Sequence, residues 1–210
     1  LRGLTFGLRQ AEVAAVSHLE EVGVKFLERL IHADEQIARE LRGSGCLHCG
    51  GPLHRADFPR KPRGLPDEVE GAFSSRHSFC CGHCRKRATP PSLRFMGRKV
   101  YVAHLVVRAC LSWQELAGRV RRLVLGVPRR TVGRWNTWWR SGIPATEFWR
   151  MSLARLMPPV DVTELPRALV ERFGAVLDNL TETLVFLAPI TTGSAGELMV
   201  EIRHAEDGAS

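Results

Sequence analysis

Two pairs of cysteines have the residue type and the spacing for metal chemistry. They are Cys46 and Cys49, and Cys81 and Cys84, with two residues between the members of each pair. Four thiolates arranged in this way can surround one tetrahedral zinc ion. Because four protein ligands leave no open position for water or a substrate, the ion would be structural. The sequence therefore predicts one structural Zn²⁺ held by Cys46, Cys49, Cys81 and Cys84.

The same segment allows other interpretations. Disulfide bonds are disfavoured because nothing marks the chain as secreted, and paired cysteines in a cytosolic protein more often bind metal. Cys80 precedes Cys81 and could replace it as a ligand. Cys110 lies in an apolar run and is interpreted as a buried core thiol. Four histidines near the cysteines are further candidate ligands: His48, His54, His77 and His83.

The positive charge of the chain is concentrated in its middle. The 210 residues, enough for one ordinary domain or two small ones, carry a formal charge of +8. Residues 94–140 contain eleven Arg or Lys and one acid, whereas residues 141–210 contain ten acids and five basic residues. An imbalance of this size favours a polyanionic partner, most simply nucleic acid, over a face that is merely solvated.

Neither a secretory signal nor a membrane-spanning segment is recognised. The longest apolar run, from Val100 to Leu111, contains His104 and Arg108 and is too short to cross a bilayer. We expect a cytoplasmic protein associated with the nucleoid, without a membrane partner.

The patterns predict a mainly α protein with a small β zinc ribbon, organised in four parts. Residues 1–45 form an N-terminal helical segment, and residues 46–98 form the zinc ribbon. Residues 99–142 form a helix-turn-helix region, and residues 143–210 form short helices followed by a loose tail. Inside the ribbon, residues 52–66 are rich in Pro, Gly and Arg and predict short strands with an extended basic loop.

This basic loop has two interpretations. Arg60, Lys61 and Arg63 could contact phosphates, and a disordered insertion is an equal alternative.

The helix-turn-helix prediction depends on two helices and the break between them. A buried helix is expected from Lys99 to Leu111. Ser112 and Glu115 then have the spacing of a capping box, which predicts that a new helix begins there. Gly126 and Pro128 break that helix, and another begins at Arg129 and ends near residues 141–142. Helix, short glycine-containing turn, helix is typical of DNA-binding proteins.

The second helix has an apolar stripe and a basic face. At 100° per residue, Val132, Trp135 and Trp139 fall on one side, and Trp138 lies at the flank, against DNA or over the edge of the core. Arginine can bond guanine through two acceptors, and Gly133 would allow close approach of the backbone. A core helix with solvated arginines is the competing interpretation. The predicted DNA-binding residues are Arg129, Arg130, Arg134, Thr137 and Arg140 in this helix, and Arg119, Arg121 and Arg122 in the preceding one.

Two motifs resemble a known family. Residues 81–95, Cys-Gly-His-Cys-Arg-Lys-Arg-Ala-Thr-Pro-Pro-Ser-Leu-Arg-Phe, resemble the second knuckle and following strand of the zinc ribbon in bacterial insertion-sequence transposases. Residues 125–135, Leu-Gly-Val-Pro-Arg-Arg-Thr-Val-Gly-Arg-Trp, resemble the turn and recognition helix of transposase-type helix-turn-helix domains. The resemblance covers residues 46–140 and implies binding of double-stranded DNA. It also implies a separate transposase subunit, or a second copy of the chain, as partner.

The chain departs from this family after Arg140. A transposase needs a catalytic domain in which three acidic residues hold two metal ions. No clear set of strands follows Arg140, and Asp161, Asp178 and Glu197 are spaced like ordinary surface acids. We therefore predict no catalytic residues and no enzymatic activity. The expected function is sequence-specific DNA binding by a transposase-related protein without its own catalytic centre.

Two other functions remain as alternatives. An RNA-binding zinc protein should expose aromatic side chains for base stacking, but the tryptophans mostly occupy helical core positions. A protein-interaction module would use the ribbon as a scaffold, and its binding would not depend steeply on salt as DNA binding does. The tryptophans concerned are Trp113, Trp135, Trp138, Trp139 and Trp149.

Overall fold

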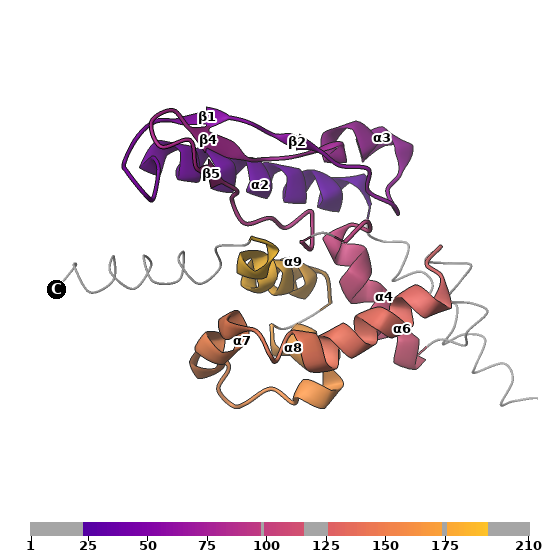
Figure 1. Ribbon diagram of the computed structural model, residues 1–210. Helices are drawn as coiled ribbons and strands as arrows, with labels where there is room; N and C mark the ends of the chain where they lie inside the picture. Colours follow the sequence, from indigo (N-terminus) through magenta and orange to yellow (C-terminus); the bar gives the residue numbers. More distant parts are fainter. Residues whose placement is uncertain (1–22, 98, 116–125, 174–175, 193–210) are drawn as a thin grey trace, which may run out of the picture.

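The computed structural model describes residues 23–97, 99–115, 126–173 and 176–192 (Figure 1). The elements form two layers. Helix α2 (Val24–Ser44) lies along the small sheets of the cysteine module in one layer, and helices α4, α6, α7, α8 and α9 form the other. The prediction of a mainly α protein with a small β part is confirmed at this level.

Helix α2 buries one face against the rest of the protein. Phe26, Leu27, Leu30 and Ala38 are buried at helical spacing, as the apolar pattern predicted. The helix ends at Gly45, whose φ of +81° is a left-handed conformation that favours glycine. This turn leads directly into the first cysteine pair. The part of the predicted N-terminal helix before residue 23 lies outside the described residues.

The cysteine module contains two small antiparallel sheets. Strands β1 (Leu53–Arg55), β4 (Phe79–Cys81) and β5 (Arg87–Ala88) form a sheet in the order β1-β4-β5. Strand β2 (Phe58–Pro59) pairs with β3 (Ser75–Arg76). The short helix α3 (Asp67–Glu70) and a 3-10 turn (Gly71–Phe73) connect the two strands β2 and β3. Residues 52–66 thus take part in both sheets, and the alternative of a disordered insertion is wrong.

The second layer is helical throughout. It comprises α4 (Ala103–Glu115), α6 (Arg129–Thr137), α7 (Glu147–Ser152), α8 (Arg167–Arg172) and α9 (Val176–Leu187). Helix α6 continues into a π-helical turn, Trp138–Gly142, and 3-10 turns occur at Leu153–Arg155, Val162–Glu164 and Ala188–Thr191. Helices α7, α8 and α9 match the short helices predicted after residue 143. The tail from residue 193 lies outside the described residues.

The prediction of a helix start at Ser112 is wrong. Helix α4 runs without interruption from Ala103 to Glu115, so Ser112 lies inside a helix and not at its N-terminus. The capping-box pattern is local, whereas the buried run from Val102 to Cys110 has already established helical backbone before Ser112 is reached. Residues 116–125 lie outside the described residues. The break before α6 is confirmed, because residues 126–128 are not helical and Pro128 precedes the first turn.

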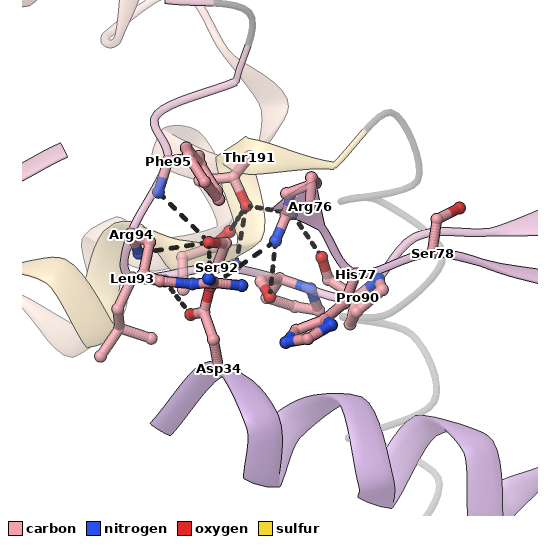
Figure 2. Close-up of polar contacts among 12 residues, drawn as sticks. Asp34, Arg76, His77, Ser78, Pro90, Ser92, Leu93, Arg94, Phe95 and Thr191 are labelled. Atoms are coloured by element: carbon pink, nitrogen blue, oxygen red, sulfur yellow. Dashed lines mark hydrogen bonds and ion pairs between the residues drawn. The ribbon is translucent and has the colours of Figure 1, made fainter. Parts of the chain in front are cut away.

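A buried carboxylate holds helix α2 in place (Figure 2). Asp34 of α2 has no exposed surface and accepts hydrogen bonds from the Leu93 N–H (2.6 Å) and from Arg94 Nε (2.8 Å). The Ser92 hydroxyl also donates to Asp34. Arg76 of β3 lies 4.0 Å from the same carboxylate. Because these donors come from the loop after the ribbon and from the ribbon itself, Asp34 holds α2 against both.

The C-terminal turn reaches the same network. Thr191 Oγ1 accepts a hydrogen bond from the Ser92 N–H (3.0 Å), and Arg76 Nη2 lies 3.4 Å from it. Figure 2 shows Thr191 on the opposite side of this cluster from Asp34. Three segments that are far apart in sequence are therefore connected through one group of buried polar side chains.

Candidate metal centre and basic helix face

The four predicted cysteines lie together. The four Sγ atoms are all within 4.8 Å of one another, and the Cys46–Cys84 and Cys49–Cys81 pairs are each 3.5 Å apart. A tetrahedral zinc site with Zn–S bonds of about 2.3 Å would place its sulfurs about 3.8 Å apart. The separations exclude disulfides, in which the sulfurs are about 2.05 Å apart. The cluster is therefore positioned to hold a metal ion.

The two cysteine knuckles, residues 46–51 and 81–86, are closed by the same backbone hydrogen bond. The Cys46 N–H donates to the Gly51 carbonyl and the Cys81 N–H donates to the Lys86 carbonyl, each at 2.9 Å and each spanning five residues. Two segments of unrelated sequence thus fold into the same turn around their cysteines. In both turns the thiol groups lie on the side that faces the other pair of cysteines, so the four sulfurs form one cluster.

The residue after each knuckle has an unusual backbone conformation. Gly50 has a φ of +68° and Arg85 a φ of +62°, and Arg85 is the non-glycine residue with positive φ among the described ones. A left-handed backbone is unfavourable for residues with a side chain. In the turn before Arg85, the His83 and Cys84 N–H groups both lie 3.4 Å from Cys81 Sγ. The left-handed residue thus ends a turn whose amides face a sulfur of the candidate metal centre.

These amides change the acidity of the cluster. Burial raises the pKa of the Cys81 thiol, but hydrogen bonds from the Cys84 and His83 N–H groups and from neighbouring cysteines outweigh it, and the pKa falls to about 6. The thiolate is the form that binds metal. A backbone hydrogen bond with Lys86 lowers the pKa of the Cys84 thiol, but burial and the neighbouring cysteines Cys49, Cys46 and Cys81 outweigh it and raise that pKa to about 12. Without a cation, the cluster thus favours one thiolate, at Cys81.

The alternative ligands lie outside the cluster. Cys80 alternates with Cys81 on β4, and its Sγ is 3.5 Å from the Arg85 carbonyl, to which it donates. No histidine belongs to the sulfur group in the described part of the chain. His83 packs on Gly51 and His54 on Gly82, where a Cβ atom would lie 2.7 and 2.8 Å from the rings. The predicted set with Cys81 is thus the one brought together.

Cys110 is a core thiol, as predicted. It is 2 % exposed, and burial raises its pKa to about 12. Among the described residues, the four-cysteine cluster is the sole group of three or more Cys, His, Asp or Glu close enough to hold a metal ion.

Helix α6 faces the core with the stripe that its sequence predicts. Val132, Trp135 and Trp139 are 5 %, 7 % and 0 % exposed. Arg129, Arg130, Arg134, Thr137 and Arg140 are all exposed. No acidic residue occurs from residue 129 to residue 142. The face opposite the core is therefore uniformly basic or neutral.

Gly133 leaves that face open. A Cβ atom at this position would have no neighbouring atom within 4 Å among the described residues. The Thr137 hydroxyl donates to the Gly133 carbonyl (3.2 Å), so its oxygen can still accept a hydrogen bond from a ligand. A ligand can thus approach the backbone of α6 closely at Gly133.

Trp138 covers the edge of the core. Its ring lies over Gly142, where a Cβ atom would be 2.5 Å from Trp138 Cδ1, and Lys99 Nζ is 3.5 Å from the ring centroid. A cation over an aromatic face is stabilised electrostatically. Of the two roles considered for Trp138, packing against the protein is the one observed.

The basic loop of the ribbon lies beside the segment that leads into α4, which the sequence alone did not reveal. The Arg63 N–H donates to the Val100 carbonyl (3.0 Å), and the neighbouring Tyr101 ring packs edge-on against Trp135 at 5.1 Å between centroids. Lys61 and Arg63 are exposed. A Cβ atom at Gly64, which has a φ of +83°, would overlap the Leu105 side chain of α4, so the loop packs closely on that helix.

Arg60 has a different role from its neighbours. Its Nη2 donates to the Lys99 carbonyl (2.7 Å) and the Gly97 carbonyl (3.2 Å), and its guanidinium lies over the Phe95 ring at 5.2 Å. Arg60 therefore fixes the loop after the ribbon and is less able to contact a ligand.

The remaining candidates are the arginines before α6 and three acidic residues. Arg119, Arg121 and Arg122 lie outside the described residues, as does Glu197. Asp161 is exposed and accepts from the Thr163 N–H (2.8 Å) and hydroxyl (2.7 Å), so it caps the turn that follows. The side chain of Asp178 is not among those described. None of the described helices is long and apolar enough to cross a membrane.

The fold and the cluster define a mainly α protein with a small antiparallel β module that carries a four-cysteine candidate metal centre. Comparisons of the chain with protein-family models, with curated proteins and with solved structures found no match.

Proposed function

We propose that the protein binds double-stranded DNA sequence-specifically, with α6 in the major groove and with a structural Zn²⁺ in the four-cysteine cluster. The observation that carries this proposal is the basic face of α6 around the open backbone at Gly133. A major groove admits a helix whose side chains reach base edges.

Zinc is proposed because the four candidate ligands are all cysteine sulfurs. Four thiolates at near-tetrahedral separations suit zinc, because soft sulfur ligands select zinc or iron over magnesium, calcium and manganese. The ion would tie together Cys46 and Cys81, which are 35 positions apart. Its binding free energy would contribute directly to folding of the module.

The contacts of α6 divide into two kinds. Arg130, Arg134 and Thr137 would reach base edges, because they project from the centre of the exposed face. Arg140 and Arg129, at the ends of the face, would lie nearer phosphates. Lys61 and Arg63 of the ribbon loop would flank the helix and contact the sugar-phosphate backbone, which fixes position without reading sequence.

The preceding helix and the relation to transposases belong to this proposal. A helix over part of residues 112–125 would cross the DNA backbone with Arg119, Arg121 and Arg122 near phosphates. A separate transposase subunit or a second copy of the chain would then supply what this chain lacks. We propose no catalytic centre, and DNA incubated with the protein and Mg²⁺ is expected to remain uncut.

RNA binding is less well supported. Sequence-specific recognition of single-stranded RNA uses exposed aromatic rings for base stacking. The large apolar side chains that are exposed in the described part of the chain are all aliphatic: Leu47, Val100, Leu153, Met157 and Val185. Duplex DNA is therefore the preferred partner.

A comparison of two arginine variants tests the proposal. Arg134→Ala should lower the affinity for a selected duplex by about 1–3 kcal/mol and relax the preference at one base pair. Arg150→Ala, an exposed arginine of α7, is the matched control and should have little effect. Affinities are measured by fluorescence anisotropy after selection of a binding site from random duplexes. Equal effects of the two variants, or no selected sequence, would contradict the proposal.

A further inference from the structure

A basic groove lies between α2 and the β1-β4-β5 sheet, apart from both sites described above. It has a volume of about 380 Å³, within the range of roughly 300–1,000 Å³ typical of ligand sites. Ala38 of α2 and Phe79 of β4 contribute its apolar part. Three exposed arginines line it: Arg39 and Arg42 from α2, and Arg55 from β1.

The charge of this groove is not balanced. Glu35 is the one acidic residue among those lining it. Neither Arg39 nor Arg42 forms an ion pair with a carboxylate among the described residues, although Arg39 Nε lies 3.4 Å from the Glu35 carbonyl. Two guanidinium groups thus face the groove without a neutralising partner. An anion would supply that partner.

Arg55, the third arginine of the groove, is held in position by two neighbouring side chains. Its Nε donates to Asp57 Oδ2 (2.7 Å), and its Nη2 lies 3.4 Å from His77 Nδ1. His77 Nδ1 also lies 3.6 Å from Asp57 Oδ2, so these three side chains form one polar group. The guanidinium is therefore fixed between two side chains and loses little freedom when it binds a ligand.

His77 provides a second indication of a ligand. It lines the groove and is 8 % exposed, yet its Nε2 has no hydrogen-bond partner in the described part of the chain. Buried polar atoms are nearly always paired. Figure 2 shows the His77 ring lying beside α2.

We propose that this groove is a phosphate-binding site that takes a backbone phosphate of the bound DNA. Guanidinium groups bind phosphate oxygens through paired N–H donors, which the exposed walls of the groove present. Three more exposed basic residues continue the positive surface beyond β4, namely Arg85, Lys86 and Arg87. A polymer with repeated phosphates matches a surface of this extent better than a single small anion does.

The inference rests on the proposed function and extends it along the molecule. Phe26, near the start of α2, packs against His104 of α4, the helix that α6 contacts. Arg39 is 13 residues further along α2, which corresponds to roughly 20 Å at 1.5 Å per residue. The groove would therefore contact the DNA beyond the segment that α6 reads.

The test compares two pairs of substitutions that remove the same charge. Arg39→Ala with Arg42→Ala removes two groove arginines, and Arg150→Ala with Arg155→Ala removes two exposed arginines from elsewhere. The duplex affinity of the zinc-loaded, full-length chain is measured at several salt concentrations. Loss of the one phosphate held in the groove should reduce the slope of log K against log[salt] by about 0.9, the contribution of each neutralised phosphate. The second pair should leave the slope unchanged.

A second measurement does not depend on DNA. Inorganic phosphate is titrated into the protein while the arginine Nε–H signals are followed by NMR. Saturable shifts are expected for Arg39, Arg42 and Arg55, and they should be lost in the groove variant. If alanine at these positions impairs folding, as judged by circular dichroism, Arg39→Gln with Arg42→Gln replaces it.

The outcomes separate the two proposals. Equal slopes for both pairs of substitutions, or phosphate-induced shifts without any change of slope, would overturn the assignment of the groove to a DNA phosphate. An effect of Arg134→Ala without an effect of the groove variant would overturn the groove alone. If the unmodified chain binds no duplex at all, the proposed function fails, and the groove assignment fails with it.

Discussion

Replacing Asp34 with alanine should destabilise the fold, because its carboxylate is buried and binds both the ribbon and the loop that follows it. Asp34 has no exposed surface and lies 2.8 Å from Arg94 Nε and 4.0 Å from Arg76 Nη1. Without it, two arginines that are 2 % and 3 % exposed would remain without a carboxylate. Removing one partner of a buried ion pair costs about 3–5 kcal/mol. The hydrogen bonds to Ser92 and Leu93 would be lost in the same step.

This magnitude is large against the total stability of a domain, about 5–15 kcal/mol. Urea unfolding at pH 7 with excess zinc measures it, followed by tryptophan fluorescence because Trp135, Trp139 and Trp149 are buried in the helical layer. Glu40→Ala is the matched control on the exposed side of α2 and should change the free energy of unfolding by no more than about 0.5 kcal/mol.

A double substitution tests the cause of the loss. Asp34→Ala combined with Arg94→Leu should be less destabilising than the sum of the two single changes, because it leaves fewer buried charges unpaired. An Asp34→Ala variant as stable as Glu40→Ala would refute the reasoning. Strict additivity of the two substitutions would show that the ion pair is not the source of the effect.

Three further predictions follow from the sites. Elemental analysis should find one zinc per chain, lost in Cys46→Ser and retained in Cys80→Ser; loss in both would contradict the ligand set. Gly133→Ala should raise helix stability by up to about 1 kcal/mol yet weaken duplex binding, and unchanged binding would mean that this face does not approach DNA. Burial, with Arg108 nearby, lowers the pKa of His104 from 6.5 to about 3, so the unfolded chain binds a proton that the folded chain does not. Stability should therefore fall as the pH falls from 6.5 toward 3, by about 2 kcal/mol at pH 5, and His104→Phe should remove that part of the pH dependence.

The features predicted well were those encoded by neighbouring residues. The stripe of Val132, Trp135 and Trp139 follows from the helical period alone, so its burial could be predicted without knowing what covers it. The four cysteines were identified from spacing, since two residues between thiols suit a knuckle around one ion. The capping box at Ser112 was misread for a related reason. A local pattern is overridden when a longer buried run has already fixed the backbone.

The sequence by itself determined which residues could bind a metal and which side of α6 faces the core, because both depend on intervals of two to four residues. Only the tertiary structure decided which of several arginines are buried and which are exposed. It buried Arg76 and Arg94 around Asp34 and left Arg39 and Arg42 exposed beside a groove. It also brought Arg63 beside the segment that leads into α4. The burial and pairing of a charge depend on partners tens of residues away, and no local interval specifies where those partners will lie.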